Sequence, residues 1–229
     1  MRAPCQVNWR VFYRRSSSEW KEVDKLGHRV LILRVALALV FVVFSRQGFA
    51  EQATPPSDAQ MPFEKGAVEV SVLGGVSLPL SLFRANADHS LSMASFEIGR
   101  VMSGGRNGNN LQLILDVTPW IQVRQPQAVR GWSVSPVFVR WNFPPAGVRG
   151  PRLFAEIAGA LLFTAQPVPV RTTTFNFLDQ AGFGVRIEER AGRAWLIGYR
   201  FQHISNGGRV KPNPGENFNF VYFGVSFIR

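Results

Sequence analysis

The feature that most constrains the fold is a repeated alternation of apolar with polar or small residues along extended segments. In residues 194–206 the odd positions are mostly aromatic or aliphatic, whereas the even positions mix small and polar groups with two apolar ones. In residues 217–229 the odd positions from Val221 onward are apolar, although Phe218 and Phe220 break the pattern near the start. Successive side chains of a β-strand point to opposite faces, so this period of two indicates strands with one apolar face.

Eight such segments follow one another, with turn-forming residues between them and no long amphipathic helix. We expect strands over 67–75, 90–102, 110–123, 132–143, 152–165, 175–189, 194–206 and 217–228. Strands with one apolar face and one polar or small face are typical of an outer-membrane barrel, where they alternate between lipid and lumen. The sequence therefore predicts an all-β fold, an eight-stranded antiparallel transmembrane β-barrel.

A soluble lipocalin-like barrel or a β-sandwich would alternate as well. Three features favour the membrane barrel: the strands are long, residues 51–229 hold 15 of the 19 Phe and 4 of the 6 Trp, and the closing strand carries Phe223 and Phe227. The segment 132–143 fits less well, because Ser133 and Ser135 occupy positions on the otherwise apolar side. Side chains fill the interior of an eight-stranded barrel, so we expect no open pore.

Residues 1–50 have a different composition from the rest. Basic residues precede an apolar run from Val30 to Phe44, interrupted only by Arg34, and small residues follow at Gly48 and Ala50. This order is typical of a secretory signal peptide, with an uncleaved N-terminal anchor as the alternative. The region before the apolar run is long, which is compatible with a true start codon further downstream. We therefore expect a signal peptide over 1–50, a flexible lead-in over 51–66 and the barrel over 67–229.

The charge of the chain belongs in large part to this leader. It holds 9 of the 26 Lys+Arg and 3 of the 15 Asp+Glu, so residues 51–229 carry +5 rather than +11. The remaining cations form no cluster interleaved with aromatic residues, and the sequence predicts no nucleic-acid partner. The single cysteine, Cys5, also lies in the leader, so an exported chain would have no disulfides and would depend on packing or sheet closure.

The residues that are candidates for a catalytic site lie in the seventh segment. His203 and Ser205 are two residues apart on a strand and therefore share a face, which brings a base beside a hydroxyl nucleophile. Only His89 and His203 follow the leader, so few residues are candidates for the base. Asn206 comes next, and its backbone N–H or its amide would be able to stabilise an oxyanion.

The third member of such a site has two candidates. Glu216 is the only carboxylate after Glu189, and an antiparallel return would bring it near His203. If the closing strand turns its odd positions to lipid, however, Asn217 rather than Glu216 shares the face of His203. An irregularity near Phe218 and Phe220 would restore Glu216, so both candidates stay open here.

The stretch from 203 to 217, His-Ile-Ser-Asn-Gly-Gly-Arg-Val-Lys-Pro-Asn-Pro-Gly-Glu-Asn, resembles the signature of the lipid A 3-O-deacylase (PagL) family. That family shows His-x-Ser-Asn-(Ala/Gly), a short variable segment and an Asn-Pro-Gly-like turn before the closing strand. The segments 182–185 and 198–201 also resemble the family. The motif covers about 20–40 residues, and the eight-strand outline extends the similarity over the chain after the leader.

The resemblance implies a barrel in the outer membrane of a Gram-negative bacterium, with its active site facing the membrane. By this resemblance Ser205 is the nucleophile, His203 the general base and Asn206 an oxyanion stabiliser. The ester-linked 3-hydroxyacyl chain of lipid A would be released with no metal or cofactor, so lipid A or lipopolysaccharide is the expected partner. The acid of the family is a glutamate shortly after the turn glycine. Asn217 stands at that position here, and an Asn stabilises an imidazolium less than a carboxylate does, so we expect a reduced rate.

Other charged residues lie near the motif. Arg209 and Lys211 lie in the following loop, where they would be able to pair with lipid phosphates, whereas the even parity of Arg200 points it to the other face. His89 has no evident partner and is expected to be structural or exposed. A homodimer is compatible with this interpretation.

Two rival functions remain open at this level. One is a non-enzymatic small outer-membrane barrel that acts as an adhesin or in envelope stability. The other is a soluble periplasmic lipid-binding barrel.

Overall fold

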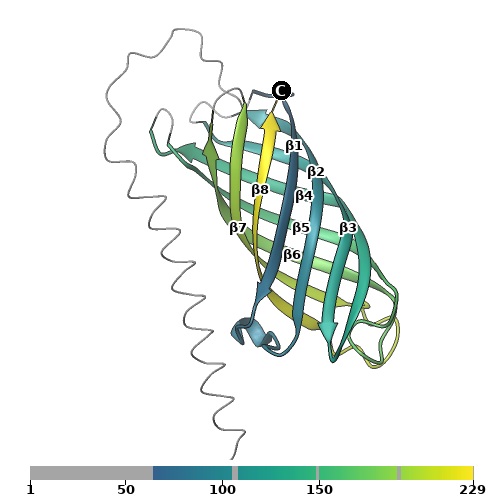
Figure 1. Cartoon of the computed structure of the whole chain (residues 1–229). Helices are drawn as coiled ribbons and strands as arrows, with labels where there is room; N and C mark the ends of the chain where they lie inside the picture. Colours follow the sequence, from purple (N-terminus) through teal and green to yellow (C-terminus); the bar gives the residue numbers. More distant parts are fainter. Residues whose placement is uncertain (1–63, 105–107, 148–149, 190–191, 229) are drawn as a thin grey trace, which may run out of the picture. The chain divides into compact units, whose positions relative to one another are not determined.

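Eight strands pair in sequence order, and the last strand closes on the first. The computed structural model describes residues 64–104, 108–147, 150–189 and 192–228. The strands are β1 (Val68–Leu78), β2 (Ser90–Gly104), β3 (Asn110–Gln125), β4 (Gln127–Pro145), β5 (Arg152–Thr164), β6 (Phe175–Glu188), β7 (Arg193–Ser205) and β8 (Glu216–Ile228). All neighbours are antiparallel, and β1 pairs with β8 from Glu69↔Ile228 to Leu78↔Asn219 (Figure 1). The predicted eight-stranded antiparallel barrel is confirmed.

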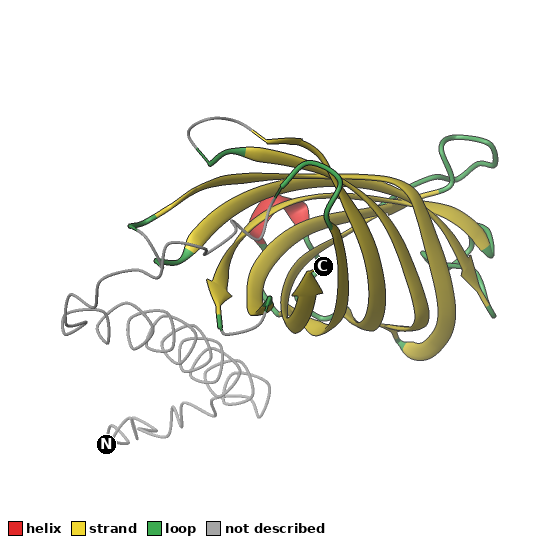
Figure 2. Cartoon of the chain, turned by 90° about the horizontal axis from the view of Figure 1, so that it is seen from above, coloured by secondary structure: helices red, strands yellow, loops and turns green. Residues whose placement is uncertain are grey.

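Helix is confined, in the described ranges, to a single turn. The 3-10 helix η2 (Leu82–Arg84) lies between β1 and β2 and is the one red element of Figure 2. No described helix is long and apolar enough to cross a membrane. The expected signal peptide over 1–50 and nearly all of the expected lead-in over 51–66 fall outside the described residues, and both stay predictions.

The first four strands extend further than the alternation predicted. The largest difference is in β4, which begins at Gln127 instead of 132, because Pro126 alone separates it from the end of β3 at Gln125. Polar residues near this turn pair in register, for example Gln122 with Arg130. Here the inward Val129 is apolar and the outward Arg130 is polar, so the outer face is no longer the apolar one although backbone pairing continues.

A β-bulge explains why β4 fitted the alternation poorly. Ser133 and Ser135 point into the barrel, but further along the strand the inward residues are Phe138, Arg140 and Asn142. Between these two groups the ladder to β5 jumps from Val134 to Val137. One extra residue in a strand exchanges its inward and outward faces. The point in β4 at which the apolar residues change from one face to the other therefore marks the bulge.

The outer wall of the barrel is apolar. Large apolar side chains are exposed there on every strand from β1 to β8 except β7, whose outward residues are half-buried. Examples are Val72, Ile98, Leu115, Trp132, Ile157, Phe183 and Phe223. A soluble barrel would expose polar groups instead, so this wall fits a lipid environment.

The lumen has an apolar section and a charged section. The apolar cluster includes Leu91, Ile121, Leu162, Leu178 and Phe218, which lie near the barrel end that carries loops 79–89, 165–174 and 206–215. This is the end where η2 lies in Figure 1, opposite the C-terminal end of β8.

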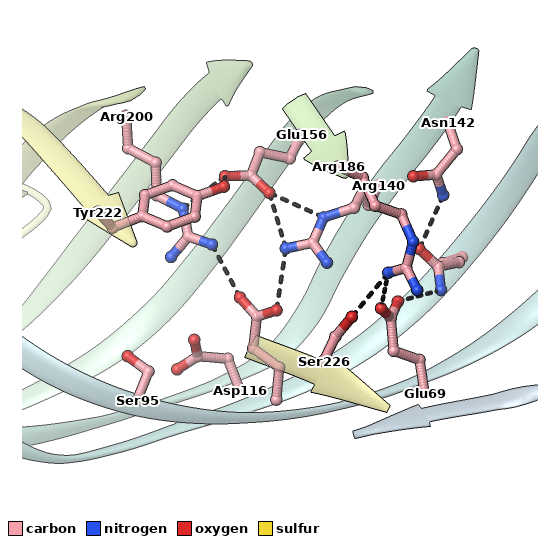
Figure 3. Close-up of polar contacts among 12 residues, drawn as sticks. Glu69, Ser95, Asp116, Arg140, Asn142, Glu156, Arg186, Arg200, Tyr222 and Ser226 are labelled. Atoms are coloured by element: carbon pink, nitrogen blue, oxygen red, sulfur yellow. Dashed lines mark hydrogen bonds and ion pairs between the residues drawn. The ribbon is translucent and has the colours of Figure 1, made fainter. Parts of the chain in front are cut away.

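Further along the lumen, two carboxylates bridge two guanidiniums (Figure 3). Glu97 accepts from Arg140 at 2.9 Å and from Arg200 at 2.8 Å, while Glu156 accepts from the same two residues at 3.0 and 2.6 Å. Tyr222 also donates its hydroxyl to Glu156 at 2.7 Å. A second group joins Arg186 to Glu69, Glu188 and Ser226. Arg200 therefore points into the lumen, as its parity predicted.

The bridging position of Glu156 gives a stability prediction. Glu156→Ala should lower the free energy of unfolding by about 3–5 kcal/mol, because it leaves two buried guanidiniums with one carboxylate between them. Urea unfolding of the barrel in lipid vesicles measures this loss. Glu189→Ala is the control, since Glu189 is solvent-exposed, and its ion pair with Arg193 at 3.3 Å and its hydrogen bond from Trp195 Nε1 at 2.6 Å are exposed contacts of small net value. A loss below about 1 kcal/mol for Glu156→Ala would contradict the bridging role.

Candidate active site

His203 lies near the end of β7 on the outer wall, opposite Asn217 on β8. The two residues are register partners, and the His203 Nδ1 and Asn217 Oδ1 atoms are 2.5 Å apart. Asn217 donates its Nδ2 to the carbonyl oxygen of Phe83 at 2.8 Å, which fixes the amide with its oxygen toward the imidazole. The Nδ1 nitrogen therefore carries the proton and donates it to Asn217. This tautomer leaves Nε2 as the free base.

Gly215 determines how the imidazole leans. A β-carbon added at Gly215 would lie 2.6 Å from His203 Cε1 and 3.3 Å from Nε2, so the ring rests directly on this glycine. The last pair between β7 and β8 is Ile204 with Glu216, and one further step brings Gly215 opposite Ser205. The ring thus leans along the wall toward the level of Ser205.

Ser205 follows His203 on the same face and is only 9% exposed. Among the described residues no hydrogen bond joins its hydroxyl to the imidazole. Nucleophile and base are often loosely placed in a structure without substrate. The structure brings His203, Ser205 and Asn217 together on one patch of the outer wall.

Asn206 organises the loop that follows β7. Its backbone N–H donates to Asn213 Oδ1 at 3.0 Å, and its Nδ2 donates to the Val210 carbonyl at 2.8 Å. The expected oxyanion role is therefore limited to the second hydrogen of the Asn206 amide. Gly207, which has a φ of +65°, comes two residues after Ser205, and its backbone N–H is a further candidate donor that the sequence did not single out.

Glu216 does not face His203. Its side chain turns into the barrel, where its Oε1 lies 2.9 Å from His89 Nδ1, so His89 has a partner that the sequence did not reveal. The even residues Phe218 and Phe220 also point inward and belong to the apolar lumen cluster. The irregularity that would have restored Glu216 is absent from β8, whose register with β7 is continuous. Parity thus gives Asn217, of the two candidates, the position beside the imidazole.

A second asparagine supports the same arrangement. Asn219 accepts from the Tyr199 hydroxyl at 2.6 Å and donates to the carbonyls of Leu80 and Leu82 at 3.0 and 3.1 Å. Together, Asn217 and Asn219 hold residues 80–83 over the outer wall of β8, and Asn219 is fully buried as a result. The signal that would have found this contact is the pair of amides at odd positions of a strand whose odd face is otherwise apolar.

Residues 80–83 are held in an uncommon conformation. Phe83 has a φ of 54° and Arg84 a φ of 61°, in the left-handed region that bulky residues rarely adopt. The Phe83 ring packs edge-on against Phe201, with ring centroids 5.5 Å apart. Strained backbone persists where surrounding contacts determine it, and it is frequent at functional sites.

Arg209 fastens the loop 206–215 to β6. Its guanidinium donates to the carbonyls of Asn206 and Phe175 at 2.9 and 2.8 Å and lies over the rings of Phe175 and Phe177, 4.4 and 5.2 Å from their centroids. Lys211, in the same loop, is exposed. In the described part of the chain no group of three or more His, Cys, Asp or Glu side chains is arranged to hold a metal ion.

The contact between Gly215 and the imidazole gives a prediction with a close control. Gly215→Ala should displace the imidazole and slow the labelling of Ser205 by a fluorophosphonate on the order of 100-fold, because small misplacements of a base are costly. Gly208→Ala is the control: Gly208 lies in the same loop with a φ of +74°, against +67° for Gly215, but nothing lies within 4 Å of its added β-carbon. Equal labelling rates for the two variants would contradict the contact.

Comparison with known proteins adds a family to this geometry. The family model described as "Lipid A 3-O-deacylase (PagL)" matches residues 85–226, more than half of the chain. The solved structure titled "Crystal structure of the outer membrane enzyme PagL" is 18% identical and has a TM-score of 0.46, covering 68% of this chain and 97% of that one. A search of curated proteins found no match. The extent of the family match shows that this chain belongs to the PagL family.

Proposed function

We propose that this protein is an outer-membrane lipid A 3-O-deacylase that uses Ser205 as nucleophile and His203 as base. The observation that carries the proposal is the His203–Asn217 hydrogen bond of 2.5 Å, formed beside Ser205 on an apolar outer wall. Such a site is poorly suited to a water-soluble substrate. It suits an acyl ester that already lies in a membrane leaflet. Membership of the family supports lipid A as that substrate.

An aromatic row supports an interfacial level for the nucleophile. Trp132 stacks on Phe163 with ring centroids 4.4 Å apart, and Phe163 is 4.9 Å from Phe175. Phe177, the next outward residue of β6, is the register partner of Ser205. Aromatic girdles mark the membrane–water interface of outer-membrane barrels. Ser205 would then lie just below the head groups, where the esters of a membrane lipid are found.

The loops support an orientation toward the outer leaflet. The loops 79–89, 165–174 and 206–215 lie at the end of the barrel that carries the site, and two of them contact it. Outer-membrane barrels have short periplasmic turns and longer extracellular loops. The site would therefore face the outer leaflet, which contains lipid A. Lys211 would be able to pair there with a lipid phosphate, whereas part of the Arg209 guanidinium is already engaged.

The mechanism follows from the tautomer of His203. Nε2 takes the proton of Ser205 as Oγ attacks the acyl carbonyl, and the oxyanion is stabilised by N–H groups from Asn206 and Gly207. The imidazolium returns the proton to the 3-oxygen of the sugar, which leaves, while the 3-hydroxyacyl chain stays on Ser205. Water, activated by Nε2, then releases the fatty acid. Asn217 keeps the imidazole oriented through both steps.

The nucleophile and base are tested by lipid A mass spectrometry. Cells that express the wild-type protein should lose one 3-hydroxyacyl group from lipid A, and cells with Ser205→Ala or His203→Ala should lose none. Ser92→Ala is a matched control, because Ser92 is a half-buried serine on the outer face of β2. Unchanged lipid A in wild-type cells, despite folded barrel in the outer membrane, would favour the non-enzymatic alternative.

The two candidates for the third member are tested in the same assay with purified protein. Asn217→Ala should reduce kcat on the order of tenfold or more, since the imidazole loses the group that fixes its tautomer. Glu216→Ala should keep most of the activity, because the Glu216 carboxylate bonds His89 inside the barrel. The reverse order of the two variants would return Glu216 to the mechanism.

A further inference from the structure

The outer wall of β6 carries an isolated carboxylate. The outward residues of this strand include Phe175, Phe177, Asp179, Ala181 and Phe183, and Asp179 is the only charged residue among them. Asp179 is exposed, and no hydrogen bond or ion pair joins it to another described residue. A charge on the lipid-facing side of a barrel is destabilising, so an ionisable residue there suggests a function.

The strand register places Asp179 on the strand beside His203. Asp179 is the partner of His203 in the β6–β7 ladder, just as Asn217 is its partner in the β7–β8 ladder. Side chains directly opposite each other on neighbouring strands have Cβ atoms about 4.5–5.5 Å apart. His203 thus has a residue with a neutral amide as its register partner on β8 and a residue with a carboxylate as its register partner on β6.

The surroundings of Asp179 leave it room to move. On β5 its register partner is Gly159, and a β-carbon added there would lie 3.8 Å from Asp179 Oδ1, so the carboxylate leans toward β5 and would have to turn to reach the imidazole. The next outward residue of β6 is the small Ala181. The β8 side of His203 is covered by residues 80–83. On the β6 side Arg209 covers Phe175 and Phe177 but leaves Asp179 exposed, so Asp179 lies where a lipid would approach.

The chemistry of the site lacks a negative charge without Asp179. When Ser205 attacks, His203 becomes an imidazolium, and the amide of Asn217 orients it but supplies no charge. The carboxylate of Glu216 is turned into the lumen. Beside lipid the effective dielectric constant is low, so a carboxylate across one strand spacing interacts strongly with the imidazolium.

We infer that Asp179 is a positioning residue that stabilises the His203 imidazolium from β6, in place of an acid at position 217. Asp179 takes no proton in this scheme. Protons move only among Ser205, His203, the leaving oxygen and the water of the second step. The inference rests on the proposed Ser205–His203 mechanism and adds to it a residue from β6.

The test uses purified full-length barrel in phospholipid vesicles that contain lipid A. Asp179→Asn should lower kcat on the order of tenfold to 100-fold with little change in KM, since the charge acts after binding. Asp179→Glu should recover much of the rate. In the Asp179→Asn background, Asn217→Asp should also recover it by placing a carboxylate on Nδ1. Glu189→Gln, at the far end of the barrel, is the matched control and should behave as wild type.

A second readout separates this inference from the proposed function. The rate at which a fluorophosphonate labels Ser205 reports serine activation without lipid A, and Asp179→Asn should slow it by the same order. If Ser205→Ala abolishes deacylation but Asp179→Asn stays within twofold of wild type in both assays, the inference is wrong and the function stands.

If the wild-type protein leaves lipid A unchanged, the proposed function fails and the labelling rates decide the role of Asp179. A wild-type Ser205 that is not labelled would overturn both. Equal losses in Asp179→Asn and Asp179→Glu would also overturn the inference. Heat-modifiable gel mobility confirms that each variant is folded.

Discussion

Closure of the sheet leaves every side chain of the barrel two possible environments. Because β8 pairs with β1, every strand has a neighbour on both sides, and each side chain must face either the lumen or the outer wall. Whether a residue stands at an inward or an outward position of its strand then decides which of the two environments its side chain enters. The guanidiniums of Arg140 and Arg200 meet carboxylates inside, and the aromatic and aliphatic side chains lie outside. A reacting group at an outward position therefore faces whatever surrounds the barrel.

The site uses the same rule to recruit groups from several segments. His203 meets Asn217 because the two are register partners, and the amide of Asn217 is held by a carbonyl from a segment more than a hundred residues away in sequence. Gly215 leaves room for the Cε1 edge of the ring to lie against the closing turn. Small changes in the turn would therefore change the chemistry, since the base and the turn share the same space.

Much of this could be predicted from alternation and spacing. The eight strands, the shared face of His203 and Ser205 and the inward direction of Arg200 all follow from a period of two. The alternation along β8 also turns Glu216 away from the face of His203, because β8 is regular and the even residues Phe218 and Phe220 belong to the lumen. Alternation fails where the backbone is irregular, as at the bulge after Ser135 in β4. It also cannot find contacts between distant segments, such as His89 with Glu216 or Phe83 with Asn217, because these depend on how loops fold over a closed barrel.

The hydrogen bonds from Asn217 and Asn219 to residues 80–83 bear on how a lipid would approach Ser205 under the proposed function. Asn217 and Asn219 fasten this segment over β8, and the Phe83 ring extends the cover to Phe201 on β7. On the opposite side, Ala181 and Phe183 of β6 are exposed. Arg209 lies over Phe175 and Phe177 of the same strand, so the exposed part of β6 beside the site runs from Asp179 to Phe183. Under the proposed function, a lipid in the leaflet would present its ester from this part of β6. Such one-sided access would select the orientation of the lipid before any bond is broken.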